Sequence, residues 1–202
     1  MNVLIISTSP RAGGNTDLLC DQVARGAAEA GAAVEKVSLR QLKISPCIEC
    51  GVCERTGDCA INDDMQPLYG KLLDADRIVF ATPVFFLGPS AQAKAFIDRC
   101  QMFWSRKFRL KREILSRDFH YGRLGYLVSV GGTRGQRVFE CTQRSLKNVF
   151  SVIEVRYSGD LLYRQVDEKA AILNHPTAMQ DAFDLGMNFR DNDRADPTDR
   201  TD

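Results

Sequence analysis

Residues 3–16 read Val3-Leu4-Ile5-Ile6-Ser7-Thr8-Ser9-Pro10-Arg11-Ala12-Gly13-Gly14-Asn15-Thr16. The first four are a continuous apolar run of strand length, and a loop rich in hydroxyl groups and glycine follows them. Apolar residues then recur at helical spacing, at Leu18, Leu19, Val23 and Ala27. This order of strand, loop and helix indicates the opening unit of an α/β domain.

The same alternation continues to about residue 158. The apolar patterns predict strands at Ala33 to Ser38, Ile78 to Ala81, Leu124 to Val130 and near Val152 to Ser158. They predict helices through Leu68 to Leu73, capped by Asp63 or Asp64, from about Ser90 to Phe103, and near Val138 to Phe150. Continuously apolar strands between helices imply a parallel sheet covered on both faces. We therefore predict an α/β fold, a flavodoxin-like three-layer sandwich with a five-stranded parallel sheet in the order 2-1-3-4-5.

The composition is that of one domain with a tail. Of the 202 residues 44% are hydrophobic, enough for one core, and residues 1–188 are expected to fold as a unit. Residues 189–202 are rich in Asp and Arg and are expected to be disordered. A net charge of +1 argues against nucleic acid or a membrane as a partner. Because Met1 leads into the first strand without a signal peptide, we expect a cytoplasmic protein with reduced thiols.

Four cysteines gather in one loop, residues 46–60. They are Cys47, Cys50, Cys53 and Cys59. Thiolates three positions apart on a tight loop can converge on one iron-sulfur cube, and the turn at 56–58 can return the fourth, so we interpret the run as ligands of a [4Fe-4S] cluster. Three alternatives stay open: a structural zinc ion, which usually takes two more widely spaced Cys-x-x-Cys pairs; disulfides, which are typical of small secreted chains; and free thiols without a metal.

The loop after the first strand has the features of a phosphate site. It opens a helix, so its backbone N–H groups and the helix dipole can hold an anion. It lacks the Gly-x-Gly-x-x-Gly of dinucleotide sites and the Gly-Lys-Ser/Thr of triphosphatases, and a phosphomonoester such as that of FMN fits better. Ser9, Asn15 and Thr16 are the expected donors, with Arg11 near the phosphate. The alternative is a plain glycine-rich turn with a helix cap.

Two further loops are expected at the same sheet edge, where ligands of such folds bind. Residues 82–89 place Pro83, Val84, Phe85 and Phe86 where they can form a wall for a flat ring system, although a core or subunit contact is the alternative. Residues 129–135 include Gly131, Gly132 and Thr133, whose amides could approach a reduced flavin closely; a simple loop is the alternative.

These motifs together carry a family resemblance over nearly the whole ordered chain. They are the Ser-x-Ser-Pro-Arg loop ending in Asn15-Thr16, the Cys47 to Cys59 run closing in Asp63-Asp64-Met65, the Thr82-Pro83-Val84-Phe85-Phe86 loop with the helix that follows it, and Ser129-Val130-Gly131-Gly132. The chain resembles the iron-sulfur flavoproteins of the NADPH-dependent FMN reductase superfamily. The resemblance implies FMN at the three loops, a [4Fe-4S] cluster on the cysteines, and a homodimer or homotetramer in which cluster and flavin of neighbouring subunits approach one another. Relatives that lack the complete cysteine motif are flavin or quinone reductases that use NAD(P)H.

The expected function is therefore that of an FMN-dependent oxidoreductase that passes electrons between a [4Fe-4S] cluster and FMN. No catalytic acid or base side chain is expected. NAD(P)H is the candidate donor, and a ferredoxin or a small molecule is the candidate redox partner. The alternatives are a cluster-free NAD(P)H-dependent FMN or quinone reductase and, from another class, a zinc-stabilised binding protein.

Two segments depart from this account or lie outside it. The family commonly has tyrosine where Phe85 stands, so a hydroxyl contact to flavin is lost there. The basic stretch 104–121 could be a cover over the flavin, an arm to a neighbouring subunit, or a solvated helix face. The other cysteines, Cys20, Cys100 and Cys141, are expected to be small core residues.

Overall fold

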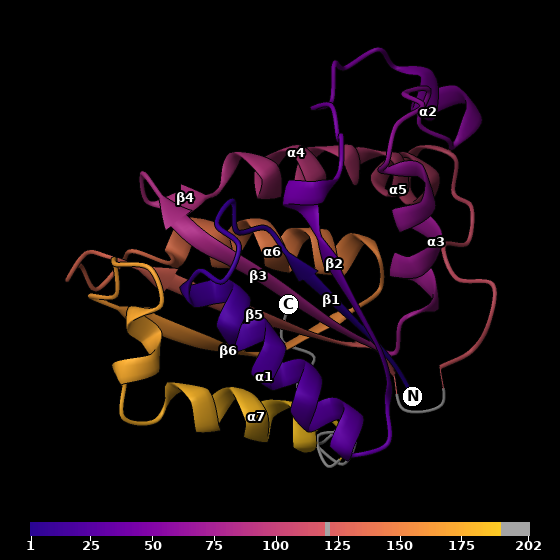
Figure 1. The fold of residues 1–202 in the computed structure, drawn as a ribbon. Helices are drawn as coiled ribbons and strands as arrows, with labels where there is room; N and C mark the ends of the chain where they lie inside the picture. Colours follow the sequence, from indigo (N-terminus) through magenta and orange to yellow (C-terminus); the bar gives the residue numbers. More distant parts are fainter. Residues whose placement is uncertain (120–121, 191–202) are drawn as a thin grey trace.

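A computed structural model describes residues 1–119 and 122–190 (Figure 1). Its sheet has the path β2-β1-β3-β5-β6, and a short β4 pairs only with β3. The strands are β1 (Asn2–Ser7), β2 (Ala33–Ser38), β3 (Arg77–Phe85), β4 (Gly88–Pro89), β5 (Leu124–Gly131) and β6 (Arg156–Arg164). All four pairings along the path are parallel. Without β4 this is the predicted order 2-1-3-4-5, so the flavodoxin-like topology is confirmed.

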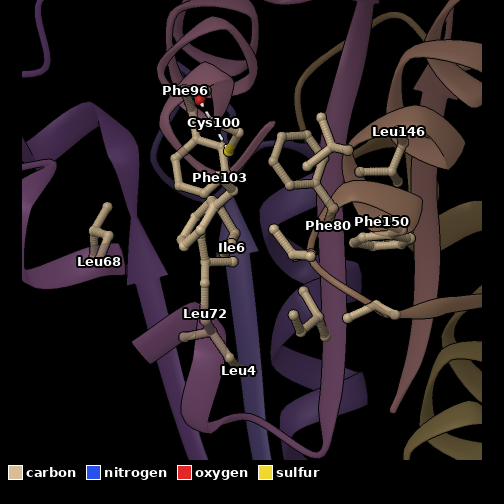
Figure 2. Close-up of a cluster of buried hydrophobic side chains, with 14 of the residues drawn as sticks. Leu4, Ile6, Leu68, Leu72, Phe80, Phe96, Cys100, Phe103, Leu146 and Phe150 are labelled. Carbon is tan, nitrogen blue, oxygen red and sulfur yellow. Dashed lines mark hydrogen bonds between the residues drawn. The ribbon is translucent and has the colours of Figure 1, made fainter. Parts of the chain in front are cut away.

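Helices cover both faces of the sheet, which gives the three predicted layers (Figure 1). One face carries α1 (Asn15–Glu29) and α7 (Ala178–Met187); the other carries α3 (Gln66–Asp74), α4 (Ala91–Arg99), α5 (Gln101–Trp104) and α6 (Glu140–Val152). Successive strand residues point to opposite faces. Accordingly Leu4 and Ile6 of β1 pack with Phe80 and Phe96 on the second face (Figure 2), whereas Val3 and Ile5 pack with α1.

The contact between α1 and α7 is close because each helix presents a glycine. A Cβ atom on Gly26 would lie 2.1 Å from the carbonyl oxygen of Phe183, and one on Gly186 would lie 2.2 Å from that of Val23. These separations leave no room for a methyl group, so glycine is required at both positions. The sequence did not predict α7, and it adds a second helix to that face.

The structure differs from the sequence predictions in three details of these elements. The strand placed at Val152 to Ser158 begins only at Arg156, because α6 continues to Val152 and the chain then turns through Glu154, whose φ is 58°. The helix over 90–103 is divided at Cys100 into α4 and α5. Neither Asp63 nor Asp64 caps α3, which begins after Met65.

The domain also extends beyond its predicted end. Phe189, assigned from the sequence to the tail, is fully buried, and its ring lies 5.1 Å from that of Tyr126. Arg77 Nε donates a hydrogen bond to the Phe189 carbonyl oxygen at 3.1 Å. The rest of the predicted tail, residues 191–202, lies outside the described residues. Within the described ranges, none of the helices combines the length and the apolar character needed to cross a bilayer.

Candidate cofactor sites

A cavity lies at the carboxyl edge of the sheet, where the loops after β1, β3 and β5 meet, together with the segment after β6. Of the residues predicted to bind FMN, this cavity is lined by Ser9, Arg11, Asn15, Thr16, Pro83, Val84, Phe85 and Gly132. Phe86, Gly131 and Thr133 are not among the lining residues. The segment after β6 contributes Val166, Asp167 and Lys169. The three predicted loops are therefore brought together, and a fourth segment that the sequence analysis missed completes the cavity.

The first loop is held in shape by a buried carboxylate, Asp17. Asp17 accepts hydrogen bonds from Gly13 N at 3.0 Å and Ser7 Oγ at 3.2 Å, and it pairs with Lys36 at 2.8 Å and Arg40 at 3.3 Å. Burial alone would raise the pKa of Asp17, but the Lys36 and Gly13 contacts outweigh it and the pKa is lowered. The carboxylate therefore stays ionised and fixes the glycine turn over the start of α1.

Asn15, which lines the cavity, also contacts the segment after β6. Its Nδ2 donates to the Glu168 carbonyl oxygen at 2.8 Å, and its Oδ1 accepts from Ile172 N at 3.1 Å. The side chain therefore ties the start of α1 to the segment after β6. A consequence is that Lys169 comes to the rim of the cavity beside Gly13.

The loop after β3 forms a two-residue hairpin turn between Phe85 and Gly88. Both central residues, Phe86 and Leu87, have positive φ, at 49° and 63°. Such turns favour Asn and Gly, so two bulky residues are strained there. Phe86 is completely exposed, at 107% of its reference surface, whereas Phe85 is 46% exposed and lines the cavity. Of the two aromatic rings, that of Phe85 lines the cavity.

The glycine loop after β5 approaches the segment after β6. A Cβ atom on Gly132 would lie 3.1 Å from Cγ of Asp167, so glycine permits this close contact. The ends of the strands are also joined by buried hydroxyls. Ser90 Oγ donates to Thr8 O at 3.1 Å, and Ser129 Oγ donates to Thr82 O at 2.7 Å. These bonds fix the three loops relative to one another.

The four cysteines of the 46–60 loop line a second cavity, of about 520 Å³. Cys47 and Cys50 are exposed and Cys53 and Cys59 are half-buried. The short helix α2 (Val52–Thr56) carries Cys53, and Gly51 and Gly57 on either side of it adopt left-handed φ values of 70° and 85°. The loop thus folds back on itself, and all four cysteines line one cavity.

Hydrogen bonds join the two ends of this loop. Lys43 N donates to Asp64 Oδ2 at 2.7 Å, and Ser45 N donates to Asp63 Oδ2 at 2.8 Å. Arg99, fully buried in α4, pairs with Asp63 and also donates to Ser45 O and Ile61 O, at 2.9 and 3.1 Å. Burial would raise the pKa of Asp63, but its bonds to Arg99 and to backbone N–H groups lower it. The sequence had placed Asp63 as a helix cap.

The basic segment after α5 holds the outer part of the same loop. Arg106 Nε donates to Gly57 O at 2.7 Å, and Arg112 Nη1 donates to Thr56 O at 2.7 Å. Arg109 lies 3.7 Å from Glu54. In the sequence analysis this stretch was a cover over flavin, an arm or a solvated helix. In its described part Arg106, Arg109 and Arg112 contact the cysteine loop, and Arg106 and Arg112 donate to carbonyl groups of the turn at 56–58.

Four cysteine thiols are the ligand number both of a structural zinc ion and of an iron-sulfur cube. Tetrahedral thiolates at a Zn–S distance of about 2.3 Å would have sulfur atoms about 3.8 Å apart. Within residues 1–119 and 122–190, no group of three or more His, Cys, Asp or Glu side chains is placed to hold a single metal ion. An iron-sulfur cube binds each thiolate to a separate iron atom, so it accepts more widely spaced ligands. Four soft thiolate donors around one cavity fit a cube in number and chemistry.

Two of the three remaining cysteines are buried as predicted, and the third is exposed. Cys20 and Cys100 are buried, and burial raises the pKa of each thiol to about 12, so both are inert core residues as expected. Cys141 is exposed, and the prediction of a core position was wrong. It lies in the first turn of α6, against Gly88 of the hairpin.

An open parallel sheet in this strand order, with a cavity at its carboxyl edge, defines a flavodoxin-like fold. A flavodoxin from the domain Archaea superposes with a TM-score of 0.56 at 12% identity, over 96% of this chain and 99% of its own. An NAD(P)H:quinone oxidoreductase of Methanothermobacter marburgensis gives a TM-score of 0.67 at 15% identity, over 94% and 96% of the two chains. At identities this low, the two superpositions show that the fold is shared and nothing more.

Sequence comparison gives the family. Residues 1–162 match the model of the NADPH-dependent FMN reductase family. An iron-sulfur flavoprotein of Methanocaldococcus jannaschii is 36% identical over 162 residues, which are 79% of this chain and 77% of that protein. The chain belongs to the iron-sulfur flavoproteins within the NADPH-dependent FMN reductase family. It is accordingly a flavin-dependent oxidoreductase whose cofactor is FMN.

Proposed function

We propose that this oxidoreductase passes electrons between FMN at the sheet edge and a [4Fe-4S] cluster on the cysteine loop. The observation that supports this proposal is the presence of two separate cavities, one lined by the three predicted flavin loops and the other by all four cysteines. FMN supplies two-electron chemistry that can be divided into single electrons, and the cluster supplies one-electron chemistry. A protein with both links donors and acceptors of different electron number.

At the flavin site the proposed contacts follow from the geometry of the lining residues. The N-terminus of α1, with Ser9, Arg11 and Thr16, presents donors and positive charge to the FMN phosphate. Lys169 adds a second cation at the same rim. Pro83, Val84 and Phe85 form the apolar wall for the ring, and Gly132 leaves room beside it. The predicted contacts of Phe86, Gly131 and Thr133 are not part of this proposal.

At the cluster site Cys47, Cys50, Cys53 and Cys59 are the proposed iron ligands. Arg99 and the segment Ser105–Arg109 hold the loop that carries them. The lining residues of the two cavities have no member in common, and α4 lies between β4 and α2 (Figure 1). This separation favours transfer between subunits of a homodimer or homotetramer, with NAD(P)H as donor and a ferredoxin or small molecule as redox partner.

Purification without oxygen tests the proposal. About one FMN, four iron and four sulfide per chain are expected, with an absorption spectrum that contains both flavin and cluster bands. The variant Cys50→Ser should lose iron and retain FMN. FMN without iron, after a failed attempt at cluster reconstitution, would instead support a cluster-free FMN or quinone reductase. Zinc without flavin would contradict both redox functions.

A further inference from the structure

Ser105 is a fully buried serine at a helical irregularity next to the cysteine loop. It opens the π-helical turn Ser105–Arg109, which follows α5 directly. Leu110 N donates to Ser105 O at 2.9 Å, the five-residue spacing of a π-turn. Such turns redirect side chains within a helix and are frequent at functional sites. The turn here directs the Ser105 side chain to the cysteine loop, with Oγ 3.4 Å from Cys53 Sγ.

This contact is unusual for a helical serine, which commonly donates to the carbonyl oxygen four residues earlier. Among the described residues, the hydrogen-bond partner of the Ser105 hydroxyl is the Cys53 sulfur. With a free thiol either atom could donate. An iron-bound thiolate carries no proton, so with a cluster present the hydroxyl must be the donor and the sulfur the acceptor.

We propose that Ser105 is a positioning residue that donates a hydrogen bond to the iron-bound thiolate of Cys53 and raises the reduction potential of the cluster. The inference rests on the proposed function. One-electron reduction adds a negative charge to the cluster and its sulfur ligands, so a donor stabilises the reduced state more than the oxidised state. Burial keeps water from replacing this bond, and hydrogen bonds to sulfur are among the factors that set cluster potentials.

The four thiols differ in access to other donors. Cys47 and Cys50 are exposed, so water can solvate them. Cys59 lies beside Tyr69. Burial is the main cause that raises the pKa of the Tyr69 hydroxyl, and the Cys59 thiol is the second. The same hydroxyl donates to Arg99 O at 3.2 Å. Cys53 contacts the buried Ser105 hydroxyl. Removal of the Ser105 hydroxyl would therefore leave Cys53 with no donor to replace it from that side.

The experiment is a redox titration of the anaerobically purified holoprotein, in which electron paramagnetic resonance follows the reduced cluster. The variants are Ser105→Ala, Ser105→Thr and the control Ser116→Ala, an exposed serine farther along the same segment. We expect Ser105→Ala to retain its iron, sulfide and FMN and to shift the cluster midpoint to a more negative potential. A shift on the order of tenfold in the reduction equilibrium is about 59 mV for one electron. Ser105→Thr and Ser116→Ala should keep the wild-type value.

Each other outcome has a distinct meaning. A fully loaded Ser105→Ala protein with the wild-type cluster potential would overturn the inference and leave the proposed function intact. Loss of iron from both Ser105→Ala and Ser105→Thr would also overturn it, because shape rather than the hydroxyl would then matter. Loss of iron from Ser105→Ala alone would support the inference, provided that Ser105→Thr keeps its iron and the wild-type cluster potential. A wild-type protein that binds no iron would contradict the proposed function and this inference together.

Discussion

Asp63 and Arg99 form a two-bond ion pair beneath the cysteine loop, with Nη1 2.7 Å from Oδ2 and Nη2 3.1 Å from Oδ1. The Arg99 side chain is fully buried and that of Asp63 is 10% exposed. Parallel bonds of this kind fix orientation as well as distance. The pair therefore fixes the position of the cysteine loop relative to α4.

Removal of the Arg99 guanidinium group should destabilise the protein strongly. In Arg99→Met the buried Asp63 carboxylate loses its partner, and breaking a buried pair in this way costs about 3–5 kcal/mol. Lys94→Met on the same helix breaks the exposed pair with Asp98 and should cost about 0.5 kcal/mol or less. Urea unfolding of the apoprotein measures both. Equal losses for the two variants would show that the Arg99 pair contributes no more than a surface pair.

Acid should unfold the protein in a way that depends on Asp17 and Asp63. Both carboxyls have a lowered pKa in the folded state, so the unfolded chain binds protons more readily. The stability that they contribute is present above the ordinary carboxyl pKa of about 3.9 and is lost as pH falls through the lower folded values. Asp17→Asn should flatten the fall of unfolding free energy below about pH 4. A slope as steep as that of the wild type would contradict this assignment.

The contact between α1 and α7 should not tolerate a methyl group. Gly26→Ala would force the helices apart and should destabilise the fold by about 1–3 kcal/mol or more. Gly70 in α3 is the matched control, since a Cβ there has no neighbour within 4 Å. Gly70→Ala should stabilise the protein by about 0.5–1 kcal/mol. Thermal or urea unfolding measures the change in stability of each variant. We expect Gly26→Ala to lower the stability and Gly70→Ala to raise it.

The hairpin turn should be improved by residues that suit its backbone. In Phe86→Asn with Leu87→Gly, both residues with positive φ are replaced by types that favour this turn, and stability should rise by about 1 kcal/mol. FMN affinity should stay within about twofold because Phe86 does not line the cavity. Leu173→Gly, at an exposed apolar residue in a short 3-10 helix, should instead lower stability. A loss of stability in the double variant would argue against turn strain.

Lys169 should distinguish FMN from riboflavin. If its ammonium group interacts with the phosphate, Lys169→Gln should weaken FMN binding by about tenfold, equal to about 1.4 kcal/mol, and change riboflavin binding little. Lys147→Gln, on the exposed side of α6, serves as the control. Fluorescence titration of the apoprotein with both flavins measures the difference. Equal weakening of both ligands would assign Lys169 to the ring or to loop structure.

The fold was predictable from the sequence because its strands are continuously apolar and alternate with helices. Val3 to Ile6 and Ile78 to Ala81 carry that signal without ambiguity. The α7 helix was not predictable in the same way. Its contact depends on Gly26 and Gly186, which are distant in sequence, and glycine lowers the local helical signal.

The site was predictable where residues act within one loop and not where they act between loops. Ser9, Arg11 and the cysteines follow local motifs, and the structure places them around two cavities. Asn15 reaches Glu168 across 153 positions, and no local pattern indicates that pairing. The sequence left the arginines after α5 open between a cover, an arm and a solvated face, because their acceptors are carbonyl groups, which any sequence contains.

Hydrogen bonds between residues 43–45 and 63–64 hold the two ends of the cysteine loop close together. Since its two ends already meet through Lys43, Ser45, Asp63 and Asp64, a short connection could span them without moving β2 or α3. Such an exchange could remove the thiols from the flavodoxin-like core in one step, and a graft in the other direction could add them. Gain or loss of the loop would then be an insertion event rather than a refolding of the domain.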